Sequence, residues 1–182
     1  MQNEQTNQSM ELSSLFILET ERLTLRRQTM EDVPFLIDLW SDPEVTRHVG
    51  GPREREWLRE AFEDTARNPF AEKYDLWVTV EKESGEPIGH CGFVDKEVEG
   101  RAEFDLCYFF AKFAWGRGYA TEIGRALVYH AQHGLGLKRI IALIDPANNG
   151  SRRVAEKVGL KLEREIVRPG DAPRALYALE FE

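Results

Sequence analysis

The sequence predicts an α/β fold, in which helices flank a mixed, mostly antiparallel sheet within a single domain. Three observations predict this fold class. Segments that alternate apolar and polar residues, as strands do, are interleaved with segments of helical spacing. The length of 182 residues suits one ordinary domain. In addition, no linker rich in Pro, Gly or Ser and no internal repeat divides residues 15–182.

The expected elements follow the order β-α-α-β-β-β-α-β-α-β-β. In chain order they are a strand over 15–27, helices over 29–41 and 53–68, strands over 74–81, 88–95 and 102–110, a helix that runs from a glycine-rich loop to about residue 133, a strand over 139–144, a helix over 148–158, and strands over 161–167 and 174–181. A helix separates the third and fourth of the later strands, so one crossover connection is expected there.

Local signals support the elements of the first half. Leu23 and Leu25 alternate with polar neighbours, as in a strand with one buried face. Thr29 is a favourable residue before a helix, and the residues over 41–43 end that helix. The polar, glycine-containing stretch 83–86 between two apolar runs predicts a β-hairpin.

Similar signals support the second half. Tyr119, Ile123 and Leu127 fall on one stripe of the long helix. The apolar run over 139–144 is typical of a short buried strand. Gly159 ends the next helix, and Pro169-Gly170-Asp171 joins the last two strands.

Composition argues against several classes of protein. Asp and Glu outnumber Lys and Arg by 32 to 24, so the formal net charge is −8, which disfavours binding to nucleic-acid phosphates. The longest apolar run, 106–111, has six residues, whereas a membrane span needs about 20. Residues 1–14 lack Lys and Arg, so we expect a flexible polar tail rather than a targeting signal. Two cysteines without a CxxC pair fit a reducing cytoplasm.

The most specific local motif is Trp-Gly-Arg-Gly-Tyr-Ala-Thr at 115–121, between an expected strand and an expected helix. Glycines let backbone N–H groups converge, and a helix N-terminus adds a positive dipole end, so this loop is suited to a pyrophosphate. The P-loop pattern GxxxxGK[ST] is absent from the sequence. The dinucleotide pattern GxGxxG is not met either, because Thr121 replaces the third glycine and Asp145 follows Gly116 by 29 residues rather than about 20.

Basic residues are concentrated around this loop. Residues 112–125 and residues 152–157 each carry a net charge of +2, which leaves −12 for the rest of the chain. The positive charge favours an anionic ligand at the loop, and the acidic remainder favours a cationic second substrate.

Two segments together resemble the acetyl-coenzyme A motifs of the GNAT acyltransferase superfamily. They are residues 109–122, which contain the glycine loop, and residues 145–159, with the sequence Asp-Pro-Ala-Asn-Asn-Gly-Ser-Arg-Arg-Val-Ala-Glu-Lys-Val-Gly. Residues 21–26 and 41–45 are similar to the opening of the RimJ/RimL-type group of N-acetyltransferases. The resemblance covers residues 15–182 and implies a GNAT-like acetyltransferase domain.

The resemblance implies acetyl-CoA as the co-substrate. Its pyrophosphate would lie on the N–H groups of 117–121, and Asn148 and Ser151 would face the pantetheine arm and the sulfur. The structural alternative for Asn148 and Ser151 is helix capping. The expected cofactor-binding residues are Phe109, Phe110, Trp115, Gly116, Arg117, Gly118, Tyr119, Ala120, Thr121, Asn148, Ser151 and Arg152.

The catalytic candidates are two carboxylates and a hydroxyl. The strand period of two places Glu103 and Asp105 on one face of the strand over 102–110, opposite the core, where a carboxylate can take a proton from an ammonium group. Glu103 is the first choice, because it aligns with the acid of the RimJ/RimL-type group on this strand, and Asp105 is the reserve. Ser151 is the third candidate. Backbone N–H groups near Phe109 and Phe110 are the expected donors to the oxyanion.

The sequence therefore predicts an N-acetyltransferase in which a primary amine attacks acetyl-CoA directly in a ternary complex. The acceptor would be a protein N-terminus or a small-molecule amine, with no metal, nucleic acid or membrane partner, and the protein would be a cytoplasmic monomer or homodimer. Val154 and Ala155 occupy the positions where many superfamily members carry a tyrosine that protonates the departing thiolate. The proton donor is therefore open, and a non-catalytic acyl-CoA-binding module is the alternative.

Overall fold

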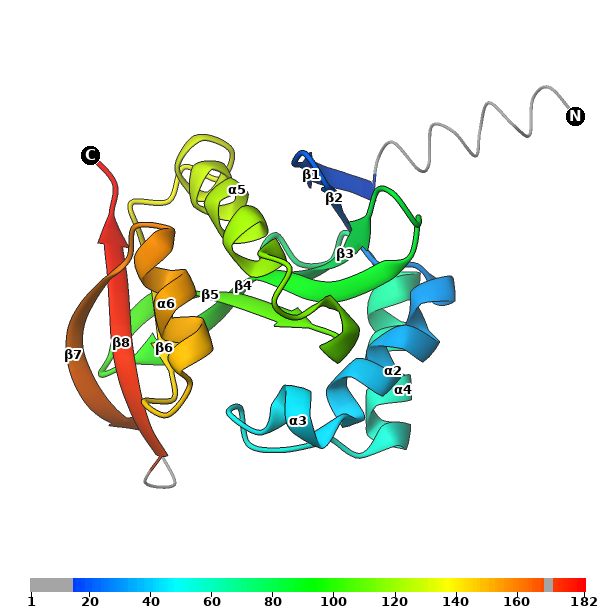
Figure 1. Cartoon of the computed structure of the whole chain (residues 1–182), viewed down its shortest axis with the longest axis horizontal. Helices are drawn as coiled ribbons and strands as arrows, with labels where there is room; N and C mark the ends of the chain where they lie inside the picture. Colours follow the sequence, from blue (N-terminus) through cyan, green and yellow to red (C-terminus); the bar gives the residue numbers. More distant parts are fainter. Residues whose placement is uncertain (1–14, 169–171) are drawn as a thin grey trace, which may run out of the picture.

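An eight-stranded sheet in the order β1-β2-β3-β4-β5-β6-β8-β7 forms the centre of the molecule (Figure 1). The computed structural model describes residues 15–168 and 172–182. The tail expected over 1–14 and the turn expected over 169–171 lie outside the described residues. Within them, the expected α/β class and the single mixed sheet are confirmed.

The helices and strands agree with most of the expected elements. The strands are β1 (Phe16–Glu19), β2 (Leu23–Arg26), β3 (Leu76–Glu81), β4 (Pro87–Val98), β5 (Arg101–Phe110), β6 (Arg139–Ile144), β7 (Lys161–Arg168) and β8 (Ala172–Glu180). The helices are α2 (Val33–Ser41), α3 (Pro43–Thr46), α4 (Arg55–Arg67), α5 (Tyr119–His133) and α6 (Asn149–Lys157), with 3₁₀ turns η1 (Met30–Asp32) and η2 (Lys112–Ala114).

The single strand expected over 15–27 is wrong, because the chain reverses in its middle. The N–H of Thr20 donates to the carbonyl of Leu23 at 2.8 Å, and the N–H of Leu23 donates to the Thr20 hydroxyl at 3.0 Å. These bonds close a turn, so β1 and β2 pair with each other as an antiparallel hairpin. The polar run over 19–22, between the apolar residues of β1 and those of β2, permits this turn but does not by itself predict it.

The residues over 41–43 end one helix, as expected, but they also begin another. The Asp42 carboxylate accepts hydrogen bonds from the N–H groups of Glu44 and Val45, at 2.8 and 3.4 Å, and Pro43 occupies the first turn of α3. This is the arrangement of a helix N-cap. The short α3 helix and the segment after it form one wall of the cavity described below.

Helices cover both faces of the sheet (Figure 1). Leu127 of α5 belongs to the main core together with Phe93 of β4. On the other face, His90 of β4 contacts the rings of Trp40 in α2 and Phe62 in α4. The strands near the middle of the sheet are therefore buried on both sides, which holds them rigidly.

The sheet opens between β5 and β6. These two strands are parallel, as expected for strands joined by the α5 crossover, and their register consists of one pair, Asp105 with Ile141. By contrast, β4 pairs with β5 over ten positions and β6 with β8 over six. Beyond Asp105 the carboxyl ends of β5 and β6 therefore separate. No helix within residues 15–168 and 172–182 is long and apolar enough to span a membrane.

Candidate active site

A cavity of about 1020 Å³ lies at the point where β5 and β6 separate. The carboxyl ends of both strands, the glycine loop with the start of α5, and the start of α6 line its walls. The segment over 44–53 and the strands β4, β7 and β8 complete them. The two sequence motifs, 109–122 and 145–159, thus meet at one cavity.

The glycine loop exposes backbone donors. Gly116 and Gly118 have φ angles of +73° and +83°, in the left-handed region where side chains are disfavoured. Gly118 also stands just before the first turn of α5. In the part of the chain that the structure describes, the backbone N–H groups of 116–120 donate no hydrogen bond. A helix N-terminus with unpaired N–H groups at a cavity is suited to an anion.

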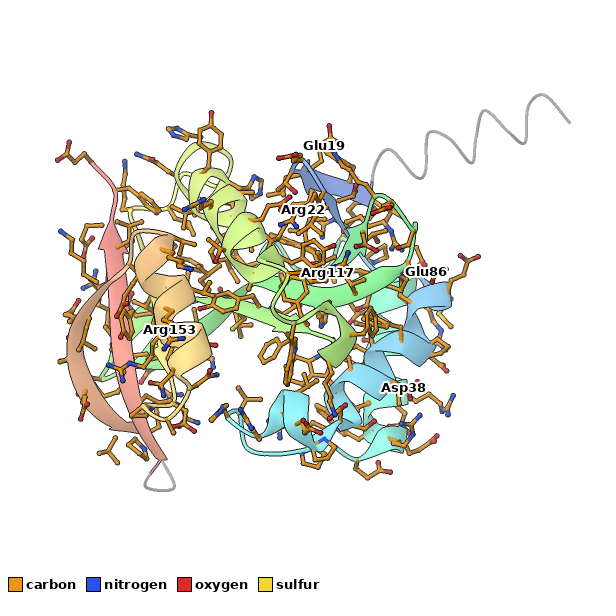
Figure 2. The ribbon with its side chains drawn as sticks, viewed as in Figure 1. Glu19, Arg22, Asp38, Glu86, Arg117 and Arg153 are labelled. Atoms are coloured by element: carbon orange, nitrogen blue, oxygen red, sulfur yellow. The ribbon has the colours of Figure 1, made fainter. Side chains whose placement is uncertain are left out.

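Two arginines stabilise this loop from outside the cavity lining (Figure 2). Arg22, in the β1–β2 turn, forms an ion pair with Glu122 at 2.6 Å and donates to the carbonyl of Arg117 at 3.0 Å. The Arg117 side chain pairs with Glu81 at 2.9 Å. Both guanidinium groups lie over the ring of Tyr119, at 4.5 and 4.9 Å from its centroid. The Arg117 guanidinium is therefore already paired with Glu81, and the donors available at the cavity are backbone N–H groups of the glycine loop.

Most of the other expected cofactor-binding residues lie together. Those that line the cavity are Phe109, Phe110, Trp115, Gly116, Gly118, Tyr119, Ala120, Thr121, Asn148 and Ser151. The Asn148 side chain caps α6, since its oxygen accepts from the Ser151 N–H at 3.0 Å. Arg152 does not line the cavity. Its guanidinium donates instead to the Tyr177 hydroxyl at 3.1 Å and the Pro146 carbonyl at 3.4 Å.

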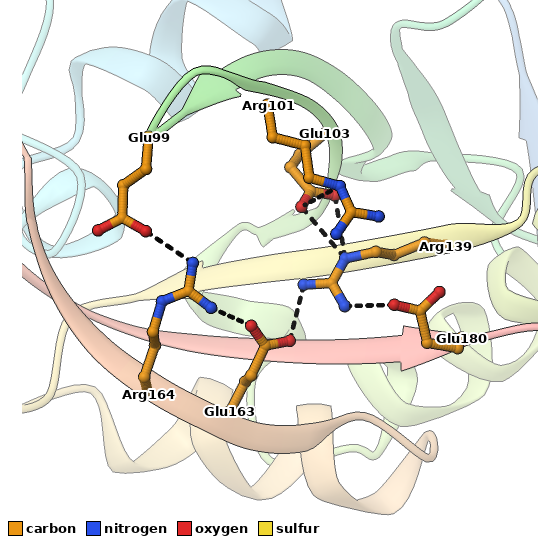
Figure 3. A network of polar contacts seen from close by, with 7 residues as sticks. All are labelled: Glu99, Arg101, Glu103, Arg139, Glu163, Arg164 and Glu180. Atoms are coloured by element: carbon orange, nitrogen blue, oxygen red, sulfur yellow. Dashed lines mark hydrogen bonds and ion pairs between the residues drawn. The ribbon is translucent and has the colours of Figure 1, made fainter.

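Glu103 lies away from the cavity, in a network of ion pairs (Figure 3). Its carboxylate is 3.1 Å from the guanidinium of Arg139 and 3.4 Å from that of Arg101. Arg139 also pairs with Glu163 at 2.7 Å and with Glu180 at 2.6 Å. The face of β5 that carries Glu103 was expected to lie open, opposite the core. At this position it is covered, because Arg139 lies over it, so Glu103 has no access to the cavity lining.

Asp105 is the strand carboxylate that lines the cavity. It is 3.0 Å from the ammonium group of Lys96 and accepts a hydrogen bond from the Leu143 N–H at 3.0 Å. This bond satisfies a β6 donor just where the β5–β6 pairing ends. Burial raises the pKa of Asp105 above its ordinary value, while Lys96 acts in the opposite direction. A carboxylate with a raised pKa at a cavity is a candidate proton acceptor.

Two functional candidates escaped the sequence reasoning. His48, from the segment after α3, donates through Nδ1 to Asp145 at 2.8 Å, because Arg47 donates to its other ring nitrogen at 3.0 Å. The Tyr108 hydroxyl donates to the carbonyl of Ser151 at 2.9 Å. Burial raises the pKa of Tyr108, which keeps its proton in place at neutral pH. No local motif marks these contacts, because each joins residues more than 40 positions apart.

In this structure two parallel strands separate beside a glycine loop at a helix N-terminus, and a buried carboxylate lies at the same cavity. This arrangement agrees with an acetyltransferase of the GNAT type. The chain belongs to the GNAT acetyltransferases: the family described as acetyltransferase (GNAT) domain matches residues 22–161. It is 34% identical to the protein YkkB of Bacillus subtilis (strain 168), over 88% of this chain and 93% of YkkB. It is 33% identical to the N-acetyltransferase p20 of Bacillus licheniformis, over 80% of this chain and 83% of p20.

A solved structure agrees with this assignment. The crystal structure of an acetyltransferase from Agrobacterium tumefaciens str. C58 superposes with a TM-score of 0.73 at 29% identity, over 90% of this chain and 94% of that one. The superfamily inferred from the two sequence motifs is thereby confirmed, and so is the enzyme class, an acetyltransferase. The RimJ/RimL-type group is a finer assignment and stays a prediction.

Proposed function

We propose that this protein transfers the acetyl group of acetyl-CoA to a primary amine by direct attack in a ternary complex. One observation carries the proposal: a single cavity joins the N–H groups of Gly116 and of 118–120, which donate to no described residue, to the carboxylate of Asp105. GNAT acetyltransferases take the acetyl group from acetyl-CoA, and the loop has the donors that its pyrophosphate requires. The acetyl thioester would then lie deeper in the cavity, toward Ser151 and the separated strands.

The proposed reaction consists of proton transfers and of one exchange of bonds at the acetyl carbonyl carbon, where a carbon–nitrogen bond replaces the carbon–sulfur bond. The ammonium form of the acceptor first gives a proton to a base, and Asp105 is the proposed base. The amine nitrogen then bonds to the acetyl carbonyl carbon as the carbon–sulfur bond breaks. The CoA sulfur gains a proton from a side-chain acid, the second proton of the nitrogen replaces the proton that this acid has given up, and Asp105 releases the first proton to solvent. Glu103, the first choice from sequence, is replaced in this proposal because it lies under Arg139.

Tyr108 is the proposed proton source for the sulfur. The helix positions Val154 and Ala155 offer no hydroxyl, whereas the Tyr108 hydroxyl reaches the Ser151 backbone from the neighbouring strand. Its raised pKa keeps the hydroxyl protonated at neutral pH. Because the same shift weakens the phenol as an acid, the proposed transfer to sulfur requires the second proton of the amine to reach the phenol oxygen as its own proton leaves. The strand therefore supplies the phenol that the helix lacks.

The test measures thiol release from acetyl-CoA with a panel of primary amines. We expect turnover, and we expect Asp105→Asn to lower kcat by roughly 10²- to 10⁴-fold, the usual contribution of general base catalysis. Because a base acts only when deprotonated, kcat of the unmodified protein should rise with pH through the raised pKa of Asp105. The Asp105→Asn variant should lack this rise.

Tyr108→Phe should lower kcat with little change in KM for acetyl-CoA.

Two outcomes would contradict the proposal. Tight CoA binding by calorimetry without thiol release from any amine would favour a non-catalytic acyl-CoA-binding module. If Glu103→Gln removes the pH dependence and Asp105→Asn does not, the base is Glu103 and the sequence alignment of this strand is the better guide.

A further inference from the structure

The charges around the cavity differ from those of the whole chain. The chain carries a net charge of −8, yet six Lys and Arg side chains line the cavity against three carboxylates. From the sequence, the acidic remainder of the chain is expected to favour a cationic acceptor. The net charge of the side chains that line the cavity is positive, because most Asp and Glu residues of the chain do not line it.

Each cavity carboxylate already has a side-chain partner, which is a lysine for two of them and a neutral histidine for the third. Asp105 pairs with Lys96 at 3.0 Å, and Asp145 pairs with His48 at 2.8 Å. Glu44 pairs with Lys112. At Asp105 and Glu44, an acceptor with several positive charges would therefore have to displace a lysine from an existing ion pair. Asp145 keeps its negative charge beside a neutral His48, but the charge of Arg174 acts on the same carboxylate.

Two arginines of the lining have N–H donors without an acceptor among the described residues. Arg168 ends β7, and Arg174 lies near the start of β8. These ends of the two strands lie at the lower left of Figure 1. Both are half-buried. One N–H of Arg168 donates to the Glu97 carbonyl at 2.6 Å, and one N–H of Arg174 donates to the Pro173 carbonyl at 2.7 Å. Among the described residues, neither guanidinium forms an ion pair within 4.0 Å, although each has five N–H donors.

Arg53 extends this pattern on the facing wall. It lines the cavity just before α4, and its guanidinium donates to the carbonyls of Gly51 and Val49. In the described part of the chain, none of these three arginines has a carboxylate oxygen within 4.0 Å, although the charge of Arg174 contributes to lowering the pKa of Asp145. Guanidinium groups with free donors at a partly buried surface are suited to the oxygens of a carboxylate or a phosphate.

From this charge pattern we propose that the acceptor is a primary amine that also carries an anionic group, a carboxylate or a phosphate. Arg168 and Arg174 bind the anionic oxygens, while the amine approaches Asp105. The proposal rests on the proposed function and narrows its acceptor to amino acids and related zwitterions. Polyamines and other polycationic amines are disfavoured by the same residues.

The experiment compares matched acceptors that differ only in the anionic group. Thiol release is measured with methionine against methioninamide, and with phosphoethanolamine against ethanolamine; spermidine represents the polycations. We expect kcat/KM to be roughly 10- to 100-fold higher for the anionic member of at least one pair, the usual worth of a hydrogen bond to a charged group. The pair that shows the preference identifies the carboxylate or the phosphate. Amine basicity does not explain a preference for methionine, because the amine of methioninamide loses its proton more readily.

Variants link the preference to the arginines. Arg174→Gln and Arg168→Gln should each reduce the preference toward unity, mainly through KM for the acceptor. The matched control is Arg59→Gln, the same substitution at an exposed α4 residue that pairs only with Glu56, which should leave the preference unchanged. Equal kcat/KM within both pairs, or a preference that both arginine variants retain, would overturn the proposal. So would faster turnover of spermidine than of any anionic amine.

A binding measurement keeps the two proposals separate. Calorimetry of the CoA-loaded protein with N-acetylmethionine and with N-acetylmethioninamide requires no turnover. Tighter binding of the acid, lost in Arg174→Gln, supports the anionic subsite even if no amine releases thiol. Turnover of amines without any preference for an anionic group would leave the acetyltransferase proposal intact and reject this one.

Discussion

His90 connects the core of the protein to the wall of the cavity. It is 4% exposed, its Nε2–H donates to the Leu76 carbonyl at 3.0 Å, and its Nδ1 accepts from the indole N–H of Trp40 at 3.1 Å. Trp40 in turn packs against Phe109, with ring centroids 4.4 Å apart. A neutral imidazole satisfies both contacts. Burial lowers the pKa of His90 to about 4, since a buried charge would lose its hydration.

This shift predicts how stability depends on pH. The folded pKa of about 4 lies below the ordinary value of 6.5, so below pH 6.5 the unfolded state binds the proton more readily. The stability that comes from neutral His90 is fully present above pH 6.5 and is lost as pH falls toward 4, by about 3 kcal/mol in total. Urea unfolding at several pH values should show this fall. In His90→Gln the fall should be smaller by that amount, whereas parallel curves for the two proteins would rule out the assignment.

At the residue scale, sequence predicts side-chain faces better than side-chain neighbours. The strand period correctly places Glu103 and Asp105 on one face of β5. It does not predict which of them lies at the cavity, because that depends on the position where β5 and β6 stop pairing. That position is set by contacts between residues far apart in the chain, such as Asp105 with Leu143 and Glu103 with Arg139.

At the element scale, Arg139 connects β5 to the part of the sheet formed by β6, β8 and β7. It does so at the end where β5 and β6 still lie together, before they separate. From β6 it reaches Glu103 of β5, Glu163 of β7 and Glu180 of β8, and its side chain is 9% exposed (Figure 3). Glu163 also pairs with Arg164, which pairs with Glu99. When Arg139 is removed, Glu163 keeps Arg164, but the buried carboxylate of Glu103 keeps only the longer contact with the exposed Arg101. The buried negative charge of Glu103 is then poorly compensated.

We therefore expect Arg139→Met to destabilise the fold by about 3–5 kcal/mol. The control Arg59→Gln removes an exposed ion pair and should cost at most about 1 kcal/mol. Urea unfolding of both variants at neutral pH measures the two costs. If Arg139→Met costs no more than Arg59→Gln, this network contributes no more than an ordinary surface pair.

Most elements could be predicted from sequence because their signals are local. The limits of β6 agree with the apolar run over 139–144, and α5 begins where the glycine loop ends. The strand over 15–27 divided because the turn at Thr20 depends on hydrogen bonds that periodicity does not reveal. The Arg139 network could not be predicted, because its partners are 24 to 41 residues away and meet only through the strand register.

At the scale of the whole molecule, the cavity lies between two parts of the sheet that share one registered pair. A ligand that contacts both the glycine loop after β5 and the start of α6 after β6 would hold these parts together. The loop motif could be found in the sequence, but the cavity could not, since it requires the parallel strands to separate. The positive charge of the cavity could not be predicted either, because the net charge of −8 counts every residue of the chain, including those far from the cavity.

The proposed cofactor should therefore stabilise the folded protein, and the glycine loop should decide how much. A ligand at 100 times its Kd adds about 2.7 kcal/mol to the free energy of unfolding, which for a chain of this size raises Tm by roughly 5–10 °C. Gly118→Val should abolish this rise, because a side chain at φ +83° distorts the loop. Gly100→Val is the matched control: Gly100 has φ +81° in the β4–β5 turn and does not line the cavity. Both variants should have a lower Tm without ligand, but only Gly118→Val should lose the increase with CoA. Equal increases in the two variants would place the pyrophosphate elsewhere.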